Sequence, residues 1–227
     1  MADIATGRRL LLKEFCRCVC AAGVIRYSAA SVTGARILTR GLWAAGSGKK
    51  GGEGVSLREV KVERVSVTSP KAFEDVVATL ERAIGRPDLT VFGREMAAAK
   101  TFADVEKVVQ AAVGLSGFME FARMDLGAVL RKRDGAAARQ CLRLIVGNPV
   151  IMSRMVEHVP DAGSYAPVTI LVDERADGVH LSYDRMASFL AAYGSEEALA
   201  VARELDAKVE RLLAAAATGT SASAAAK

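Results

Sequence analysis

Short stretches of alternating or consecutive apolar residues predict a set of β-strands. Residues 60–68 alternate valine with polar side chains, with one slip in register that suggests a bulge. Residues 118–130 predict a strand or a bent pair of strands, kinked at Gly127. The clearest strand signals follow one another at 141–146, 165–174 and 179–184.

The last two of these strands show the pattern best. Residues 165–174 are apolar at consecutive positions, which predicts that both faces of the strand are covered. Asp177-Gly178 supplies the positive φ that a tight hairpin needs. Residues 179–184 alternate, so one face is expected in the core and the other towards solvent, with His180, Ser182 and Asp184 on the solvent side.

Apolar residues that repeat every three to four positions predict the helices. Ser69-Pro70 is expected to open the first helix, as its cap and first residue, and Gly85 to end it. A helical region follows at 91–113, in which Thr101 and Asp104 form a capping pair.

The remaining helices accompany the central strands and the C-terminal part of the chain. Asn148-Pro149 predicts the cap and first residue of a short helix. Residues 185–193 predict another short helix, and 195–213 a long amphipathic one. The charged residues 131–135 are expected at the tip of a solvated hairpin.

Composition and charge narrow the class of protein. The chain has 227 residues, 51% of them hydrophobic, which is enough for one sizeable core. No run approaches the roughly 18 apolar residues of a membrane span, so we expect a soluble protein. The net charge of +5 arises in residues 1–50, where nine basic residues face two acidic ones, while the remainder carries 22 basic and 24 acidic residues. This near-neutral body argues against a nucleic-acid partner.

Residues 1–54 differ from the rest of the chain. Arg9, Lys13 and Arg17 form a basic stripe at helical spacing, and acidic residues are scarce, as in an organelle transit peptide. Two alternatives are a disordered extension and an overextended start, with the true start near Val55. We expect a cytoplasmic protein, or a mitochondrial or other organellar one if the segment is a transit peptide. The prediction is therefore a single domain at 55–215, preceded by this extension and followed by a disordered tail at 216–227.

The cysteines and histidines indicate no disulfide framework or metal centre. Three of the four cysteines, Cys16, Cys18 and Cys20, are clustered in the N-terminal extension, without the spacing or partners typical of zinc. The two histidines, His158 and His180, are 22 residues apart on different elements. We expect no metal site, and the sequence identifies no cofactor.

A candidate site follows from strand directions. If the three clear strands are sequential antiparallel neighbours, the end of the first, the start of the second and the end of the third reach the same rim of the sheet. The connection between the first two crosses that rim. Five polar residues from separate positions are then expected to converge there: Asn148, His158, Asp161, Tyr165 and Asp184.

Four segments carry a resemblance to a known family: IVGNP (145–149), VPDAGSYAP (159–167), VDE (172–174) and SYD (182–184). In residues and spacing the chain resembles the family called domain of unknown function 302. The resemblance implies an α+β fold, β-α-β-β-β-β-α, with an antiparallel sheet covered by helices. Residues 91–113 would be an inserted helical region and the last helix an addition. The family has no established reaction, so no catalytic residue is implied.

Three functions remain open. The first is a binding module, alone or as a homodimer, that holds a small molecule or partner at the rim. The second is an enzyme in which His158 acts as a base beside Asp161 and Tyr165. The third is a structural or interaction protein that uses its C-terminal amphipathic helix. Taken singly, the rim residues are more typical of structural roles, with Asn148 and Asp184 as helix caps and Tyr165 as a packing residue, so none is assigned a catalytic role.

Overall fold

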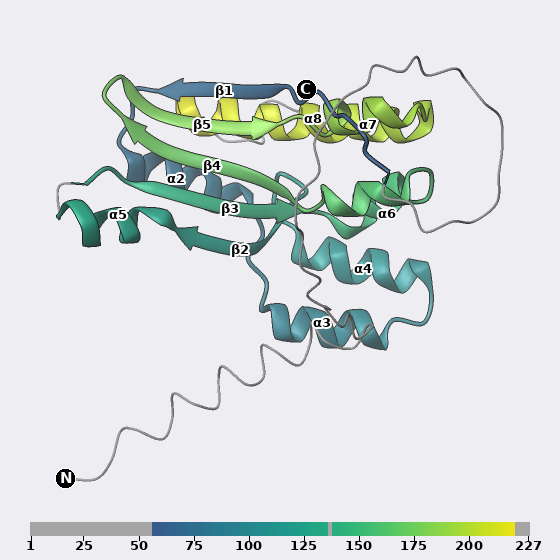
Figure 1. Cartoon of the computed structure of the whole chain (residues 1–227). Coiled ribbons are helices and arrows are strands. Elements are labelled where there is room, and N and C mark those ends of the chain that lie inside the picture. The colour runs from purple at the N-terminus through teal and green to yellow at the C-terminus, as the bar shows by residue number, and fades with distance from the viewer. Residues whose placement is uncertain (1–55, 136–137, 221–227) are drawn as a thin grey trace, which may run out of the picture. The chain divides into compact units, whose positions relative to one another are not determined.

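Five strands form one antiparallel sheet in the computed structural model, which describes residues 56–135 and 138–220 (Figure 1). The order across the sheet is β1-β5-β4-β3-β2. The strands are β1 (Arg64–Ser69), β2 (Met119–Asp125), β3 (Cys141–Gly147), β4 (Val168–Arg175) and β5 (Gly178–Asp184). The predicted α+β class is confirmed, as is the sequential antiparallel order of the three central strands. The predictions for residues 1–54, including the domain start at 55, lie outside the described residues.

Helices cover one face of this sheet and extend beyond the strand ends (Figure 1). Helix α2 (Phe73–Ala83) and helix α8 (Glu196–Thr218) lie on the same face. Helices α6 (Pro149–Val156) and α7 (Met186–Leu190) continue from the ends of β3 and β5. The other elements are α3 (Leu89–Ala98), α4 (Phe102–Ala112), α5 (Leu126–Asp134) and the 3₁₀ helices η1 (Pro160–Ser164) and η2 (Ala191–Tyr193).

The hydrophobic core lies between the sheet and α2 and α8. Leu144, Ile170 and Leu181, on three neighbouring strands, have no exposed side-chain surface. Helix α8 contributes twelve buried residues and continues to Thr218, past the predicted end near Leu213, because Ala215, Ala216 and Ala217 are also buried. The apolar stripe of α8 is thus used within its own domain.

The opposite face of the sheet has no described helix over it (Figure 1). Cross-strand register places Arg143 beside Leu171, Leu171 beside Ser182, and Ile145 beside Thr169 on this open face. Leu171 and Thr169 are half-buried. Among the described elements, the helices lie on the other side or beyond the strand ends, so the predicted cover on both faces of 165–174 is not found over Thr169 and Leu171.

The segment 118–130 differs from its prediction. Strand β2 ends at Asp125, whose side chain accepts a hydrogen bond from the Ala128 amide and caps helix α5. Residues 131–135 are therefore the last turn of α5 and its cap, where basic side chains favour the helix dipole, and not a hairpin tip. The bulge in the sheet lies in β2, between Glu120 and Ala122.

The start of the domain also differs. Strand β1 begins at Arg64, so the register slip seen in 60–68 falls before the strand. Ser69 is the last residue of β1, and its hydroxyl donates to the Ala217 carbonyl at 2.7 Å instead of capping α2. Helix α2 begins at Phe73 without a side-chain cap. The Thr101–Asp104 capping box is confirmed, and it opens α4, the second of two helices in 91–113.

Glycine forms the predicted hairpin between β4 and β5. Gly178 pairs with Arg175 and has a φ of 132°, a conformation that favours glycine. His180 was expected to face solvent but is buried, because Asp177 and Thr68 lie against the two nitrogens of its ring at 2.9 and 3.5 Å. Ser182, on the same side of β5, is buried as well.

Candidate functional site

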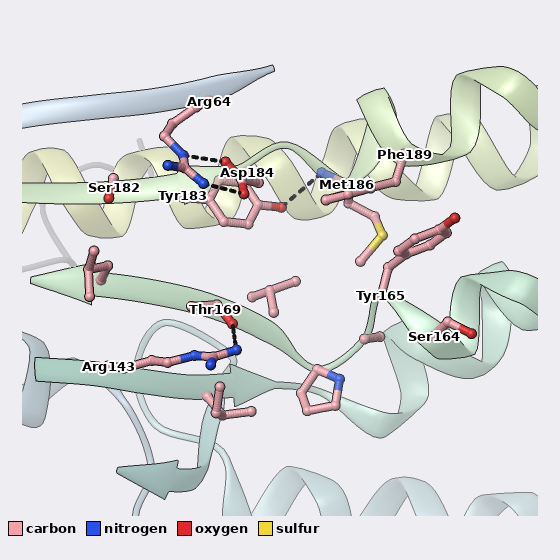
Figure 2. A pocket seen from close by; sticks show the side chains of 15 residues that line it. Arg64, Arg143, Ser164, Tyr165, Thr169, Ser182, Tyr183, Asp184, Met186 and Phe189 are labelled. Atoms are coloured by element: carbon pink, nitrogen blue, oxygen red, sulfur yellow. Dashed lines mark hydrogen bonds and ion pairs between the residues drawn. The ribbon is translucent and has the colours of Figure 1, made fainter. Parts of the chain in front are cut away.

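A pocket of about 560 Å³ opens at the rim where the open face of the sheet meets α7 and the segment before β4 (Figure 2). Residues from β1, β3, β4 and β5 form its floor and polar side. Tyr165 and Phe189 form its aromatic side. Four neighbouring strands and two connecting segments, far apart in sequence, thus contribute to one cavity.

Three charged residues line the pocket: Arg64, Arg143 and Asp184. Arg64 Nε and Nη2 donate to the two oxygens of Asp184 at 2.6 and 2.8 Å, so these charges neutralise each other. Arg143 is exposed and donates to the Thr169 hydroxyl at 3.3 Å, but it forms no ion pair with any described residue. The lining therefore carries one uncompensated positive charge.

Aromatic rings form the opposite wall. Tyr165 stacks on Phe189, with ring centroids 4.6 Å apart and planes inclined by 17°. The Tyr165 and Tyr193 hydroxyls are 2.9 Å apart, and the Arg58 guanidinium lies 4.1 Å from the centre of the Tyr193 ring. The hydrogen bond with Tyr165 raises the pKa of Tyr193, and the Asp161 carboxylate adds to this effect. Contacts on both sides of Tyr165 thus fix its ring in place.

A buried carboxylate, that of Asp206, accepts hydrogen bonds from two residues that line the pocket. Asp206 of α8 accepts hydrogen bonds from the Tyr183 hydroxyl at 2.6 Å and from the Met186 and Ala187 amides at 2.7 and 3.1 Å. Burial raises the pKa of Asp206, and burial together with this carboxylate raises that of Tyr183. These bonds fix the start of α7, and hence the position of Phe189.

The structure brings together part of the predicted rim cluster. Tyr165 and Asp184 both line the pocket, and Asp161 lies close to Tyr193, the partner of Tyr165. His158 is exposed at the end of α6, and no hydrogen bond joins it to Asp161 in the described part of the chain. The acid–base pair considered for an enzyme is therefore not assembled here.

Asn148 has a different place from the one expected. Its side-chain oxygen Oδ1 accepts from the Val150 and Ile151 amides at 2.9 and 3.3 Å, and its side-chain Nδ2 donates to the Gly117 carbonyl at 3.0 Å. The predicted helix cap is confirmed. The residue lines a separate, apolar cavity of about 150 Å³ beside α6, not the rim pocket.

Sequence reasoning missed Arg64, Arg143, Leu171 and Phe189. Cross-strand register would have found the first three, because the prediction already placed their strands and only the pairing was missing. Phe189 had no such signal, since its position depends on how α7 turns back over Tyr165.

The described residues show neither a metal cluster nor a membrane helix. Nowhere in 56–135 and 138–220 do three or more His, Cys, Asp or Glu residues gather in a way that would hold a metal ion. Within the same residues, no helix has the length and hydropathy that crossing a membrane requires. Cys141 is a free thiol, and burial raises its pKa.

One family model matches the sequence of this chain. The family model described as "Domain of unknown function DUF302" matches residues 94–216. The match includes α4 and most of α8, which the resemblance had placed in an insertion and an addition, and it leaves out β1 and α2.

One similar solved structure is the crystal structure of an uncharacterized conserved DUF302 protein from Bacillus stearothermophilus. The two share 12% sequence identity with a TM-score of 0.46, over 68% of this chain and 95% of that one. No curated protein matches the chain.

Proposed function

Since the chain belongs to the DUF302 family, whose description names no activity, we propose a function from the rim pocket: the protein is a binding module for a small molecule. The ligand lies on the open face of the sheet, between the Arg64–Asp184 pair and the Tyr165–Phe189 stack. Tyr165 and Asp184 are the two residues of the predicted cluster that contact it.

The size and lining of the pocket carry this proposal. Pockets that bind small molecules typically enclose about 300–1,000 Å³ and combine apolar walls with a few fixed polar groups. The rim pocket has about 560 Å³, an apolar and aromatic side, and polar groups held by hydrogen bonds. Contacts within the protein hold both walls, the Arg64–Asp184 pair on one side and the Tyr165–Phe189 stack on the other, and such pre-organisation lowers the entropic cost of binding.

The two other functions have less support from the geometry. An enzyme would need a free acid or base in the pocket, but Asp184 is bonded to Arg64 through both oxygens and His158 lies elsewhere. An interaction role for α8 would need an exposed apolar stripe, whereas that stripe lies in the core. A homodimer and a cytoplasmic location stay predictions.

A pair of tryptophan variants tests the proposal. Leu171→Trp places a large ring inside the pocket, whereas Leu126→Trp adds the same ring at the exposed start of α5, outside the pocket. Two measurements apply: native mass spectrometry of protein purified from its source, and fluorescence titration with the neutral probe N-phenyl-1-naphthylamine. The mass measurement also gives the oligomeric state.

We expect a retained molecule or probe binding in the wild type and in Leu126→Trp. Leu171→Trp should lose the retained molecule and weaken probe binding by about tenfold or more, because the added ring occupies the cavity. Equal binding by all three proteins contradicts the proposal. So does a wild type that retains nothing and does not bind the probe.

A further inference from the structure

We infer that the ligand of the rim pocket is a small organic monocarboxylate whose apolar body is one or two rings in size. The inference rests on the proposed binding function and specifies its ligand class. It is carried by one unpaired guanidinium, the apolar surface beside it and the aromatic wall facing it.

Arg143 is the group that would bind the carboxylate. A guanidinium has five N–H donors, and the Arg143 side chain uses one hydrogen bond, to Thr169. Its planar fork matches the two oxygens of a carboxylate and can donate to both. Because Arg64 is already paired with Asp184, Arg143 is the cation of the lining that is open to an anion.

The surface next to Arg143 is apolar. Leu171 lies directly across from Arg143 on β4, and Ile145 is two residues further along β3, on the same face. Both line the pocket, and beyond them stand Tyr165 and Phe189 (Figure 2). A ligand whose carboxylate meets Arg143 would therefore place its body over Leu171 and Ile145, with its far end against the Tyr165 ring.

The charges favour a single negative charge on the ligand. A phosphate site usually combines several backbone amides, often at a helix N-terminus. Here the first amides of α7, those of Met186 and Ala187, are already bonded to Asp206. With Asp184 neutralised by Arg64, the lining carries a single positive charge, which matches a monoanion better than a dianion.

Three related probes test the ligand class on the full chain by isothermal titration calorimetry. Naphthalene-1-acetate carries a carboxylate, naphthalene-1-acetamide is its neutral counterpart, and 1-naphthyl phosphate carries a dianionic group. Each is titrated into the wild type, Arg143→Gln and Arg139→Gln. Arg139 is an exposed cation that precedes β3 and lies outside the pocket, so it controls for the loss of one charge.

In the wild type the carboxylate should bind about tenfold or more tightly than the amide, since hydrogen bonds between charged groups exceed neutral ones by this order. Arg143→Gln should remove that preference and leave the amide affinity within about twofold. Arg139→Gln should behave as the wild type does. Because Arg143 is exposed, the variant is expected to fold, which a circular dichroism melting curve checks.

Distinct results separate failure of the inference from failure of the proposed function. Equal affinity for carboxylate and amide, with both lost in Leu171→Trp, overturns the ligand class and leaves the binding function standing. Tighter binding of the phosphate likewise overturns the carboxylate. If none of the three probes binds the wild type, the ligand class is wrong, and the neutral fluorescent probe then shows whether the pocket binds at all.

Discussion

The two faces of the sheet share the same strands but differ in what covers them. On the inner face, Leu144 and Ile170 are fully buried beneath α2 and α8. On the outer face, their chain neighbours Arg143 and Leu171 lie on an open surface that forms part of the pocket. In both β3 and β4, one of two adjacent residues packs in the core and the other lines the proposed site.

This difference shows why β3 and β4 contain apolar residues on both sides. An apolar outer residue such as Leu171 does not require a second layer of helices, because it can serve as the floor of a ligand pocket. The same substitution should therefore have different consequences on the two faces. The following predictions start from the largest expected effect.

Leu144→Ala and Leu171→Ala give the most direct test. Leu144→Ala should lower the free energy of unfolding by about 2–5 kcal/mol, since it leaves a cavity in a fully buried region. Leu171→Ala should cost only about 1 kcal/mol, because its side chain is already partly exposed. Urea unfolding followed by circular dichroism measures both. Equal losses would mean that another layer covers the outer face.

Asp206→Ala should have the next largest effect on stability. It leaves the Tyr183 hydroxyl and two amides without their acceptor, at a cost of about 3 kcal/mol in the free energy of unfolding. Tyr183→Phe removes one of these donors and should cost about 1 kcal/mol. Chemical unfolding compares the two. A loss in Asp206→Ala no larger than that in Tyr183→Phe would show that the amides find other partners.

The contribution of Asp206 to the free energy of unfolding should decrease as the pH rises. Burial raises its pKa in the folded state, so the folded protein favours the protonated carboxyl more than the unfolded chain does. Its contribution to stability is then most favourable below its unfolded pKa, about 3.9, and decreases as the pH rises through the folded pKa. Unfolding measured across this range should show the wild type losing stability relative to Asp206→Asn. A relative gain would show that the three donors outweigh burial.

Arg64→Gln should affect stability least. The Arg64–Asp184 pair lies on the surface, with 65% of the Arg64 side chain exposed, so its loss should change the free energy of unfolding by less than about 1 kcal/mol. Binding of naphthalene-1-acetate should nevertheless weaken several-fold, because Asp184 then opposes the charge of Arg143. Arg133→Gln, which breaks the exposed pair with Asp134, is the matched control and should leave binding unchanged. A large stability loss without weaker binding would make the pair structural.

The sequence predicted those features that depend on residues close together in the chain. The Asn148 cap, the Asp177-Gly178 hairpin and the order of β3, β4 and β5 each follow from a few consecutive residues or from strand direction. The meeting of Tyr165 and Asp184 at one rim followed from the same reasoning.

Features that depend on distant contacts were missed or predicted incorrectly. Leu126 and Val129 suggested a strand, yet they are exposed residues of α5, whose start is set by the Asp125 cap. His180 looked solvent-facing because an alternating pattern does not show that Thr68 and Asp177 lie against the ring. The stack of Tyr165 on Phe189 requires α7 to fold back towards η1, which no local pattern encodes.

The pairing of β1 with β5 has a consequence for biosynthesis. Arg64 and Asp184, which meet across this pair, are 120 positions apart in the chain. As the polypeptide leaves the ribosome, β1 cannot pair until β5 has been synthesised, and the core cannot close until α8 has been synthesised. The domain therefore completes its fold only when nearly all of it has emerged. Pairing between segments so distant in sequence favours slow folding. We therefore expect nascent chains that stop before α8 to depend on chaperones, because their inner apolar face remains uncovered.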